Sequence, residues 1–567
     1  MVFNQSSPGF VSSEVDLTGS VRGQATTTGA TVGNFRWGPV HEITTISNEN
    51  ELVSTFGAPN TTNSVDFHTA SYFLKYGSSL RLVREVTGVA NNSNSAGDAS
   101  TLVKNRDDYD GQTFSFGTEG LWIAKYPGVL GNSLKVSVFA FKTDAGTTAT
   151  NFAGWAYKSN LDAVVGTSQY ASDNGSSNDE IHVVVIDEDG LFTGTPGTVL
   201  ETFAFLSQAG DAKNSNGSTN YYADVINTSS NYIWFGSHDT TNFSANAGAV
   251  ATGGVNYAVS DSDGIIDASL TGGVDSAAMT STEVLAGFDL FEDSSTVDVS
   301  LLICPDMPTG SETTIANDVI ACAAGRMDAV AFVSPSSGMV TAAAVVTMAD
   351  ALTSSSYAVI DSGRLKVYDK YNDKYINIPA CAAVAGCTAA TDASDGAWYS
   401  PAGEVRGQIF GVTKLHYNPN KADRDTLYRA GVNPIVTLPG KGTMLFGDKT
   451  HLSRPSAFDR INVRRLFIAL RENISGNAEA QLFELNNEFS RARFVGAVEP
   501  FLRNIQGRNG IYDYRVVCNA TNNNSAVIDA NGFVADIYIQ PARSINFVKL
   551  NFIATRTGVD FKEIAGE

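Results

Sequence analysis

The pattern of apolar residues changes twice along this chain of 567 residues. Strands that alternate with helices are expected before residue 90 and again after residue 284, whereas the stretch between them has short strands separated by turn residues. Alternating strands and helices are typical of a sheet whose faces are covered by helices. The sequence therefore predicts a multidomain α/β and α+β protein, in which an all-β insertion interrupts an α/β domain.

The α/β parts are assigned to residues 21–89 and 285–440. In the first part, helices are expected near residues 50–56 and 67–76, followed by the strand LRLVREV at 80–86. In the second part, strands are expected in VDVSLLICPD, AVAFVS and YAVI. The Ala-rich stretches at 313–326 and 339–353 read as helices between these strands.

The insertion, residues 90–284, is rich in Asn, Ser, Gly and Thr, and its acidic residues outnumber basic ones by 22 to 7. Strand patterns occur in SLKVSVFAF and IHVVVI, so we expect a β-rich, solvent-exposed, outward-facing part. Two acidic stretches, 187–190 and 261–267, resemble parts of calcium loops. Neither has the downstream glutamate of such a loop, so both are predicted to be exposed turns without metal.

Residues 441–540 are expected to form an α+β domain. The helix expected over 461–473 places Val463, Phe467, Leu470 and Ile474 at helical spacing. A second helix is expected from about residue 478 to 505, and Pro500 is expected to break it near its end. A strand, GFVADIYIQ, follows at 532–540. The apolar residues assigned to the second helix include Leu482, Phe483, Phe489, Val495, Val498, Phe501 and Leu502.

Charge is distributed unevenly along the chain, whose formal net charge is -21. An acidic protein repels phosphates, which argues against nucleic acid as a direct partner. From residue 451 onward, however, 14 basic residues face 12 acidic ones, so this part is expected to meet a different partner. Arg464, Arg465 and Arg471 lie in its first helix. They form either a solvated helix face or a contact with an acidic partner, and the sequence favours neither.

Both ends of the chain have strand patterns without a local partner. Residues 10–17 alternate, with Val11, Val15 and Leu17 on one side and Phe10 on the other, and the Ser/Thr/Gly-rich segment 18–31 follows without a hairpin turn. An isolated strand does not persist in water, so this one must pair with a distant edge of its own chain or of another chain. We call residues 1–20 and 541–567 the two arms of the chain. The strand expected in the second arm includes Phe547, Val548, Leu550 and Phe552.

Sequence motifs for catalysis, cofactors and metals are not found. There is no G-x-x-x-x-G-K-[ST], G-x-G-x-x-G or G-x-S-x-G motif, and the six histidines are scattered. The five cysteines are odd in number and widely spread, which favours reduced, mostly buried thiols. We also find no signal-peptide pattern and no run of 18 apolar residues. We expect neither an enzyme nor a cofactor, a metal or a membrane-inserted segment.

Many short motifs follow one another along most of the chain. They are GFVSSEVDL, FRWGPV, STFGAP, LKYGSSLRLVREV, AKYPGVLGNSLKV, LLICPD, DGAWYSPAGEVRG, AGVNPIV, GTMLFGDKT, INVRRLFIALREN, LFELNNEFSRARF and FLRNIQGRNGIYDYRVVCN. In this order and number they resemble the contractile tail sheath proteins of myovirus-type bacteriophages. The resemblance is strongest in the C-terminal third and weakest in the insertion.

The resemblance implies a structural subunit that polymerises as stacked hexameric rings around a tail tube. Contraction would drive the tube through the host envelope for DNA ejection. The implied central domain is subtilisin-like but non-catalytic, since no G-T-S-x-A motif occurs in the chain. The C-terminal domain would lie innermost, with Arg464, Arg465 and Arg471 facing the tube, and both arms would donate strands to neighbouring subunits. The implied partners are copies of the chain, the tail tube protein, and baseplate and tail terminator proteins; the implied location is the virion tail, after assembly in the host cytoplasm.

Two other readings stay open. The first is a sheath from a tailocin or another bacterial contractile injection system, which would share the fold and the mechanism. The second is a secreted adhesin or carbohydrate-binding β protein, suggested by the acidic insertion rich in Asn and Ser. The missing signal-peptide pattern and the helical C-terminal third argue against the second reading.

Overall fold

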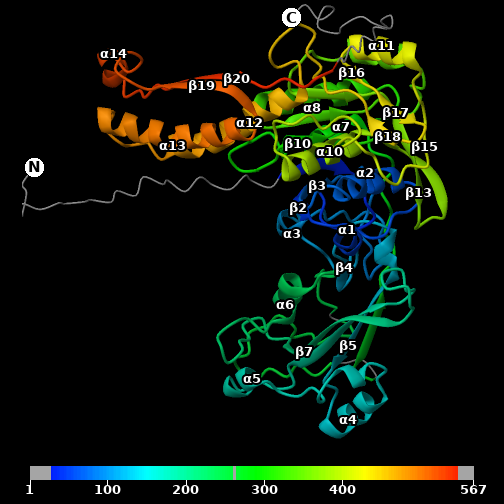
Figure 1. Ribbon diagram of the computed structural model, residues 1–567. Helices are drawn as coiled ribbons and strands as arrows, with labels where there is room; N and C mark the ends of the chain where they lie inside the picture. Colours follow the sequence, from blue (N-terminus) through cyan, green and yellow to red (C-terminus); the bar gives the residue numbers. More distant parts are fainter. Residues whose placement is uncertain (1–26, 240, 260–262, 547–567) are drawn as a thin grey trace, which may run out of the picture. The chain divides into compact units, whose positions relative to one another are not determined.

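The computed structural model describes residues 27–239, 241–259 and 263–546 (Figure 1). Its described residues form two compact units. The larger unit contains residues 27–396 and 401–464, and the smaller unit contains residues 397–400 and 465–546. The mixture of helices with parallel and antiparallel sheets confirms a multidomain protein of mixed α and β structure.

The centre of the larger unit is a sheet in the order β16-β12-β11-β10-β1-β3-β2. All neighbouring pairs are parallel except β2 and β3, which pair antiparallel at one edge. Most of these strands are buried along their whole length, as in parallel sheets covered on both faces. The strands are β1 Gly29–Gly33, β2 Ile43–Ile46, β3 Leu80–Arg84, β10 Leu301–Ile303, β11 Val330–Val333, β12 Ala358–Asp361 and β16 Val432–Asn433.

Strand β1 joins the two α/β parts of the chain into one sheet. Gly29 pairs with Leu80 of β3 on one side and with Leu301 of β10 on the other. Helices α7, α8 and α9 contribute Val284, Val319 and Val345 to the core cluster that contains residues of β1, β10, β11 and β12. The helices of this domain are α1 Glu49–Phe56, α2 Ser64–Leu74, α7 Ser281–Asp289, α8 Glu312–Arg326, α9 Ala342–Asp350, α10 Cys381–Ser394 and α11 Lys421–Arg429.

Helix α10 lies almost entirely inside the domain because its side chains are small. A Cβ atom at Gly386 would lie 2.8 Å from the Tyr76 ring, so a larger residue there would push this ring away. Cys381 and Cys387 lie in this helix, and all five cysteines of the chain are buried, as predicted. Burial raises the pKa of the Cys381 and Cys387 thiols to about 12, so both are protonated at neutral pH.

A buried polar group lies where β11 and β12 end. The Ser334 hydroxyl donates to Asp361 Oδ2 at 2.5 Å and accepts from the Cys381 backbone N–H at 2.7 Å, while the Gly363 N–H donates to Asp361 Oδ1 at 2.9 Å. Burial raises the pKa of Asp361 from 3.8 to about 7, although its two hydrogen bonds act in the opposite direction. The group therefore fixes the start of α10 to the strand ends.

Smaller β elements complete the domain. An antiparallel sheet in the order β14-β13-β15 and the pair β17-β18 lie outside the seven-stranded sheet. Their bounds are β13 Arg364–Asp369, β14 Lys374–Pro379, β15 Lys414–Leu415, β17 Ile435–Leu438 and β18 Gly442–Leu445.

The insertion contains the antiparallel sheet β7-β6-β5-β9 and the pair β4-β8. Its strands are β4 Trp122–Ala124, β5 Leu134–Ala140, β6 Glu180–Asp187, β7 Thr198–Ser207, β8 Ile233–Phe235 and β9 Ile265–Ser269. The prediction that it is all-β is wrong, because it also contains α3 Arg106–Gly111, α4 Ala145–Gly154, α5 Gln169–Asp173 and α6 Tyr222–Ser229. Asn105, Asp144 and Ser168 cap the first three of these helices with their side chains. Such polar residues are common both in turns and at the starts of helices. The composition of the insertion therefore did not indicate these helices.

The acidic turn at 187–190 differs from its prediction. The Asp187 carboxylate is buried, and its Oδ2 accepts hydrogen bonds from the backbone N–H groups of Phe192 and Thr193 at 3.0 and 2.8 Å. Its Oδ1 accepts from the Ser133 hydroxyl at 2.6 Å. The prediction of an exposed turn is therefore wrong for Asp187. Its carboxylate holds the following loop through these hydrogen bonds. The other stretch, 261–267, lies partly outside the described residues.

A buried arginine connects the insertion to the central domain. The Arg84 side chain donates to the carbonyl oxygens of Phe35, Gly38 and Pro127 at 2.8, 2.7 and 2.7 Å. Burial lowers the pKa of Arg84 to about 9, so it is still charged at neutral pH. Because Pro127 belongs to the insertion and the other three residues to the first α/β part, one guanidinium joins both.

The smaller unit is an α+β arrangement of α13 Glu488–Gly507, β19 Ile511–Val517, α14 Ser525–Asp529, β20 Asp536–Pro541 and most of α12 Ile461–Glu479. The helix predicted at 461–473 is confirmed and runs six residues longer. The predicted second helix starts ten residues late, at Glu488, where the Asn487 side chain caps it. Leu482 and Phe483 therefore lie in a loop and are exposed, as is Phe489 in the first turn of α13.

Pro500 lies inside α13 and does not end it, so the predicted break is wrong. A proline removes one N–H and leaves the carbonyl four residues earlier without its helical partner. That carbonyl belongs to Gly496, and both Gly496 and Pro500 are exposed. Water can therefore satisfy the carbonyl, and the helix continues.

We predict that replacing Arg84 by methionine lowers the free energy of unfolding by about 3 kcal/mol, because three buried carbonyls lose a charged donor. Replacing Arg81 by methionine is the matched control, since Arg81 lies on the same strand and is only partly buried. The control should lose less than about 1 kcal/mol. Urea denaturation measures both, and equal losses would contradict the assigned role.

We predict that the contribution of Asp361 to stability falls as pH rises towards 7. The folded-state pKa of Asp361, about 7, exceeds the unfolded value of 3.8, so its protonated form favours folding. This contribution is complete below pH 4 and is lost as pH rises to 7, at up to about 1.4 kcal/mol per pH unit. Denaturation at pH 5 and pH 8 should show the loss in the wild type and a smaller loss in Asp361→Asn. The same loss in both proteins would assign the pH dependence to other groups.

Candidate assembly interface

The smaller unit contains a sheet of two strands. β19 and β20 pair antiparallel, with Tyr514 opposite Ile539 and Val516 opposite Ile537. Within the described residues, no third strand lies beside either of them. A pair of strands is marginal in water, and its two outer edges present unpaired N–H and C=O groups. Each strand of the pair therefore has one outer edge beside which the described residues place no strand.

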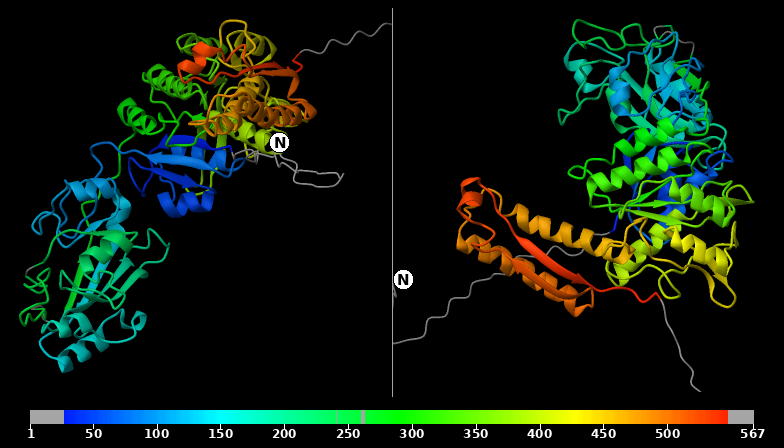
Figure 2. Two further views of the ribbon diagram at one scale, coloured as in Figure 1. Left: turned by 90° about the vertical axis from the view of Figure 1, so that its left-hand side faces the viewer. Right: turned by 90° about the horizontal axis from the view of Figure 1, so that it is seen from above.

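One face of this sheet is held by helices. Tyr514, Val516, Ile537 and Ile539 pack in a cluster formed by residues of α12 and α13, including Phe494, Val498, Leu466 and Leu470. Tyr512 and Tyr538 are 64% and 61% exposed. Figure 2 shows the strands running alongside the long helices of this unit. The helices thus preform the sheet, while its edges stay accessible.

Trp398 anchors the end of the sheet where β19 begins. Its Nε1–H donates to the Arg508 carbonyl oxygen at 3.3 Å, and the Arg508 guanidinium lies 4.6 Å from the centre of the indole ring. Asn509 has a φ of 62°, and Gly510 follows it. This Asn-Gly pair turns the chain from α13 into β19.

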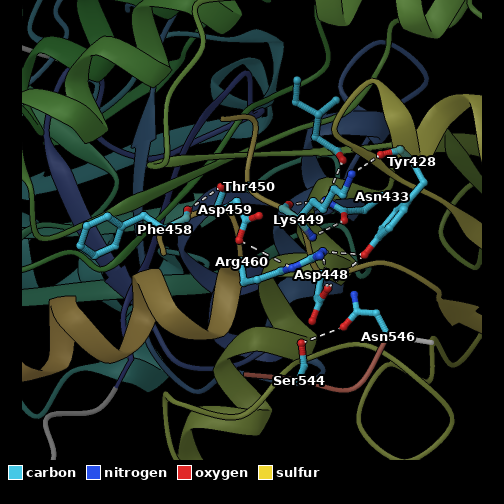
Figure 3. Close-up of polar contacts among 11 residues, drawn as sticks. Tyr428, Asn433, Asp448, Lys449, Thr450, Phe458, Asp459, Arg460, Ser544 and Asn546 are labelled. Atoms are coloured by element: carbon cyan, nitrogen blue, oxygen red, sulfur yellow. Dashed lines mark hydrogen bonds and ion pairs between the residues drawn. The ribbon is translucent and has the colours of Figure 1, made fainter. Parts of the chain in front are cut away.

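The segment before α12 is fixed by a polar network in the larger unit (Figure 3). Arg460 Nη1 donates to the Tyr428 hydroxyl at 2.7 Å and lies 3.4 Å from Asp448 Oδ1. Lys449 Nζ donates to the Tyr428 carbonyl at 2.7 Å, and the Asn433 amide donates to the Lys449 carbonyl at 2.8 Å. The first turn of α12 therefore starts from a rigid base.

The three arginines expected to face a partner lie in different surroundings. The Arg464 guanidinium is buried between the rings of Tyr357 and Phe458, at 4.2 and 4.1 Å from their centres, and Nη2 donates to the Ser356 hydroxyl. Arg465 is also buried, whereas Arg471 is exposed. A contact with an acidic partner therefore stays a prediction for Arg471, and Arg464 holds the helix start.

The arm residues lie outside the described residues. This applies to Phe10, Val11, Val15 and Leu17 of the first arm and to Phe547, Val548, Leu550 and Phe552 of the second. Strand donation by the arms is thus a prediction that stands on their sequence pattern.

Ser334, Asp361 and Cys381 meet at strand ends, where α/β enzymes place their sites, but all three are buried. The described part of the chain has no cluster of three or more side chains suited to a metal ion. In the same residues, no helix is both long and apolar enough to cross a membrane.

Sequence reasoning missed β19 as an element and the open edges of its sheet. The alternation in IYDYRVV and the preceding Asn509-Gly510 turn could have indicated the strand. The open edges could not be found in this way, because they depend on which strands pair.

Comparisons with known proteins match most of the chain. Family models match three parts: the tail sheath protein Gp18 domain III N-terminal region at residues 26–84, the phage tail sheath protein central domain at 277–451, and the phage tail sheath C-terminal domain at 453–555. The tail sheath protein of Enterobacteria phage T4 is 32% identical over 99% of each chain. That of Vibrio phage KVP40 is 31% identical over 99% of each chain.

A solved structure shares the fold. The sheath tail protein from Listeria innocua matches with a TM-score of 0.56 and 14% identity, covering 92% of each chain. At this identity the similarity concerns the fold alone. The full-length relatives and the matched models establish the family. This chain belongs to the contractile tail sheath proteins of myovirus-type bacteriophages.

Proposed function

We propose that this chain polymerises as stacked hexameric rings around a tail tube, and that the assembly contracts to drive the tube through the host envelope for DNA ejection. The open two-stranded sheet of the smaller unit is the observation that carries the proposal. Its two free edges equal in number the two arms that the sequence predicts. Full-length similarity to proteins named tail sheath protein supports the same role.

In the proposed assembly, β19 and β20 each receive an arm from another copy. Residues 10–17 have the alternation of a strand with one apolar side, formed by Val11, Val15 and Leu17. Adding such a strand to an exposed edge supplies main-chain hydrogen bonds, and its alternate side chains supply specificity. The second arm follows β20 directly in sequence, so it leaves its own sheet at Pro541.

Two arms are needed because the free energy of binding a single arm is close to zero. Each hydrogen bond of the added strand contributes roughly 0.5 to 1.5 kcal/mol, and each buried apolar side chain roughly 1.5 to 3 kcal/mol. Ordering each residue costs roughly 1 to 2 kcal/mol, which offsets most of this gain. Two arms that act together have a high effective concentration, so a lattice is stable where one contact is not.

Contraction is proposed to be a rigid-body change from a metastable lattice. The predicted linker 18–31 is wrong at its end, because Gly29 to Thr31 lie in the buried strand β1. The part before β1 would let the folded units turn while the arms keep neighbours tethered. The chain has no phosphate-binding motif, which fits a change that consumes no nucleotide. The buried hydrogen bond between Ser334 and Asp361 supports the rigidity of the folded units that such a change requires.

We also propose the finer assignments of the resemblance. The central domain would be subtilisin-like without protease activity, which the burial of Ser334 supports. The insertion would face outward and the smaller unit inward, towards the tail tube protein. Baseplate and tail terminator proteins would bind the two ends of the sheath, which would assemble in the host cytoplasm and stay in the virion tail.

Deleting residues 1–20 should leave the chain folded but unable to form tubules, because the sheet edges lose one of their strands. Electron microscopy of the purified protein measures tubule yield, and circular dichroism checks folding. A sharper variant replaces Val11, Val15 and Leu17 by serine, and its control replaces Ser12 by threonine and Glu14 by glutamine on the other face. Only the apolar-face variant should lose tubules. Normal tubules from the deletion protein would refute the tether.

Replacing Arg471 by glutamate should weaken binding to purified tail tubes and leave tubule formation unchanged, because the exposed charge is proposed to face an acidic tube. Co-sedimentation at 50 and 300 mM salt measures the effect, which should shrink at high salt, where charges are screened. Replacing Glu472 by lysine at the neighbouring exposed position should not weaken binding. Equal tube binding by wild type and Arg471→Glu would contradict the contact.

A further inference from the structure

The smaller unit has an exposed group of large apolar side chains, which we call the apolar tip: Leu482, Phe483, Leu485 and Phe489. They are 63%, 104%, 76% and 72% exposed, and they lie within eight residues of one another in sequence. Single exposed apolar residues are common, but four large ones together indicate an interaction site.

Hydrogen bonds hold the loop that carries the tip. The Asn486 amide donates to the Gly532 carbonyl at 2.7 Å and to Asn523 Oδ1 at 3.2 Å. The Ser490 hydroxyl donates to the Leu485 carbonyl at 2.7 Å. Phe483 has a φ of 66°, a backbone conformation that residues with a side chain rarely adopt. The loop is thus held in a strained form that presents Phe483 outward.

The tip borders one end of the open sheet. Asn523 and Gly532, which hold its loop, belong to the connection between the end of β19 at Val517 and the start of β20 at Asp536. In Figure 1, α14 of this connection lies beyond that end of the strands. A strand added beside β19 or β20 would therefore overhang towards the tip on one side.

We propose that the apolar tip binds the first three residues of a neighbouring copy, Met1, Val2 and Phe3. The inference rests on the proposed strand exchange, and the length of the arm supports it. Residues 10–17 span about 26 Å as a strand, more than the roughly 20 Å of the six residues of β20. For an arm that pairs antiparallel with β19, which ends at Val517 on the tip side, residues 1–9 leave the sheet at that end and can extend up to about 30 Å past it.

The chemistry of the two chain ends favours the N-terminal one. Residues 1–9, MVFNQSSPG, have no charged side chain, and their large apolar residues are the first three. The last twelve residues contain Arg556, Asp560, Lys562, Glu563 and Glu567. Placing such charges on an apolar surface would cost their hydration without pairing them. The N-terminal residues bring no charged side chain to the tip.

Photo-cross-linking in assembled tubules tests the contact. With p-benzoyl-phenylalanine in place of Phe483, we expect covalent dimers whose cross-linked peptide contains residues 1–9. The same probe in place of Tyr512 of β19 or of Tyr538 of β20, both exposed, should reach residues 10–17 from one of these two positions. If one of them reaches residues 10–17 and the Phe483 probe links to the tube, to residues 547–567 or to nothing, tip docking is overturned and strand exchange stands. If no probe at any of the three positions reaches the first arm, strand exchange fails as well.

A thermodynamic cycle gives a second test. Removing residues 2–8, which keeps the strand 10–17, should raise the concentration needed for tubule formation roughly ten-fold. Phe483→Ser should do the same, and this chain should melt like the wild type because the Phe483 side chain is exposed. Combined, the two changes should have the effect of one, since they remove the same contact. The proposal is overturned if the effects of the two changes on this concentration multiply, or if neither change has an effect.

Discussion

The unpaired backbone groups along the outer edges of β19 and β20 are the constraint on which the account of this protein depends. Open edges invite pairing with other chains, and proteins usually shorten, charge or cover them. Here the two strands are six and seven residues long, one face is held by α12 and α13, and both edges lack a further strand within residues 27–546 as described. In the proposed assembly, other copies supply the strands that these open edges lack.

The rest of the fold is consistent with a unit that has to move as a rigid body. Arg84 joins the insertion to the central domain, because it donates to Pro127 of the insertion as well as to Phe35 and Gly38. The start of α12 is fixed by the Arg464 side chain between two aromatic rings and by the network around Arg460 and Tyr428. These contacts keep each folded part intact while the proposed changes occur between copies.

The sequence predicted elements whose periodicity is strong. The helices α8 and α9 and the strands β3, β5 and β6 lie where the apolar pattern placed them, because burial on one or both faces leaves a clear period. The prediction from sequence failed where contacts between distant residues determine the local structure. The short capped helices of the insertion look like turns, and Pro500 is tolerated because the freed carbonyl at Gly496 faces water. Leu482 and Phe483 extend an apolar pattern but lie in an exposed loop.

The interface was predictable only in part. The arm pattern of Val11, Val15 and Leu17 indicated that a partner strand must exist somewhere, but not which edge receives it. Arg464 and Arg471 looked alike in sequence, since both lie on a helix rich in arginine. Their surroundings differ because the rings of Tyr357 and Phe458, which lie outside α12, enclose the Arg464 guanidinium. Pairing and enclosure of this kind depend on contacts that no local pattern contains.

The most direct measurement is electron cryomicroscopy of assembled sheath tubules at a resolution that separates strands. The account predicts that β19 and β20 are each flanked by a strand from another copy, one of them residues 10–17. It would be contradicted by a map in which residues 10–17 pair within their own chain, or in which both outer edges of the sheet stay empty.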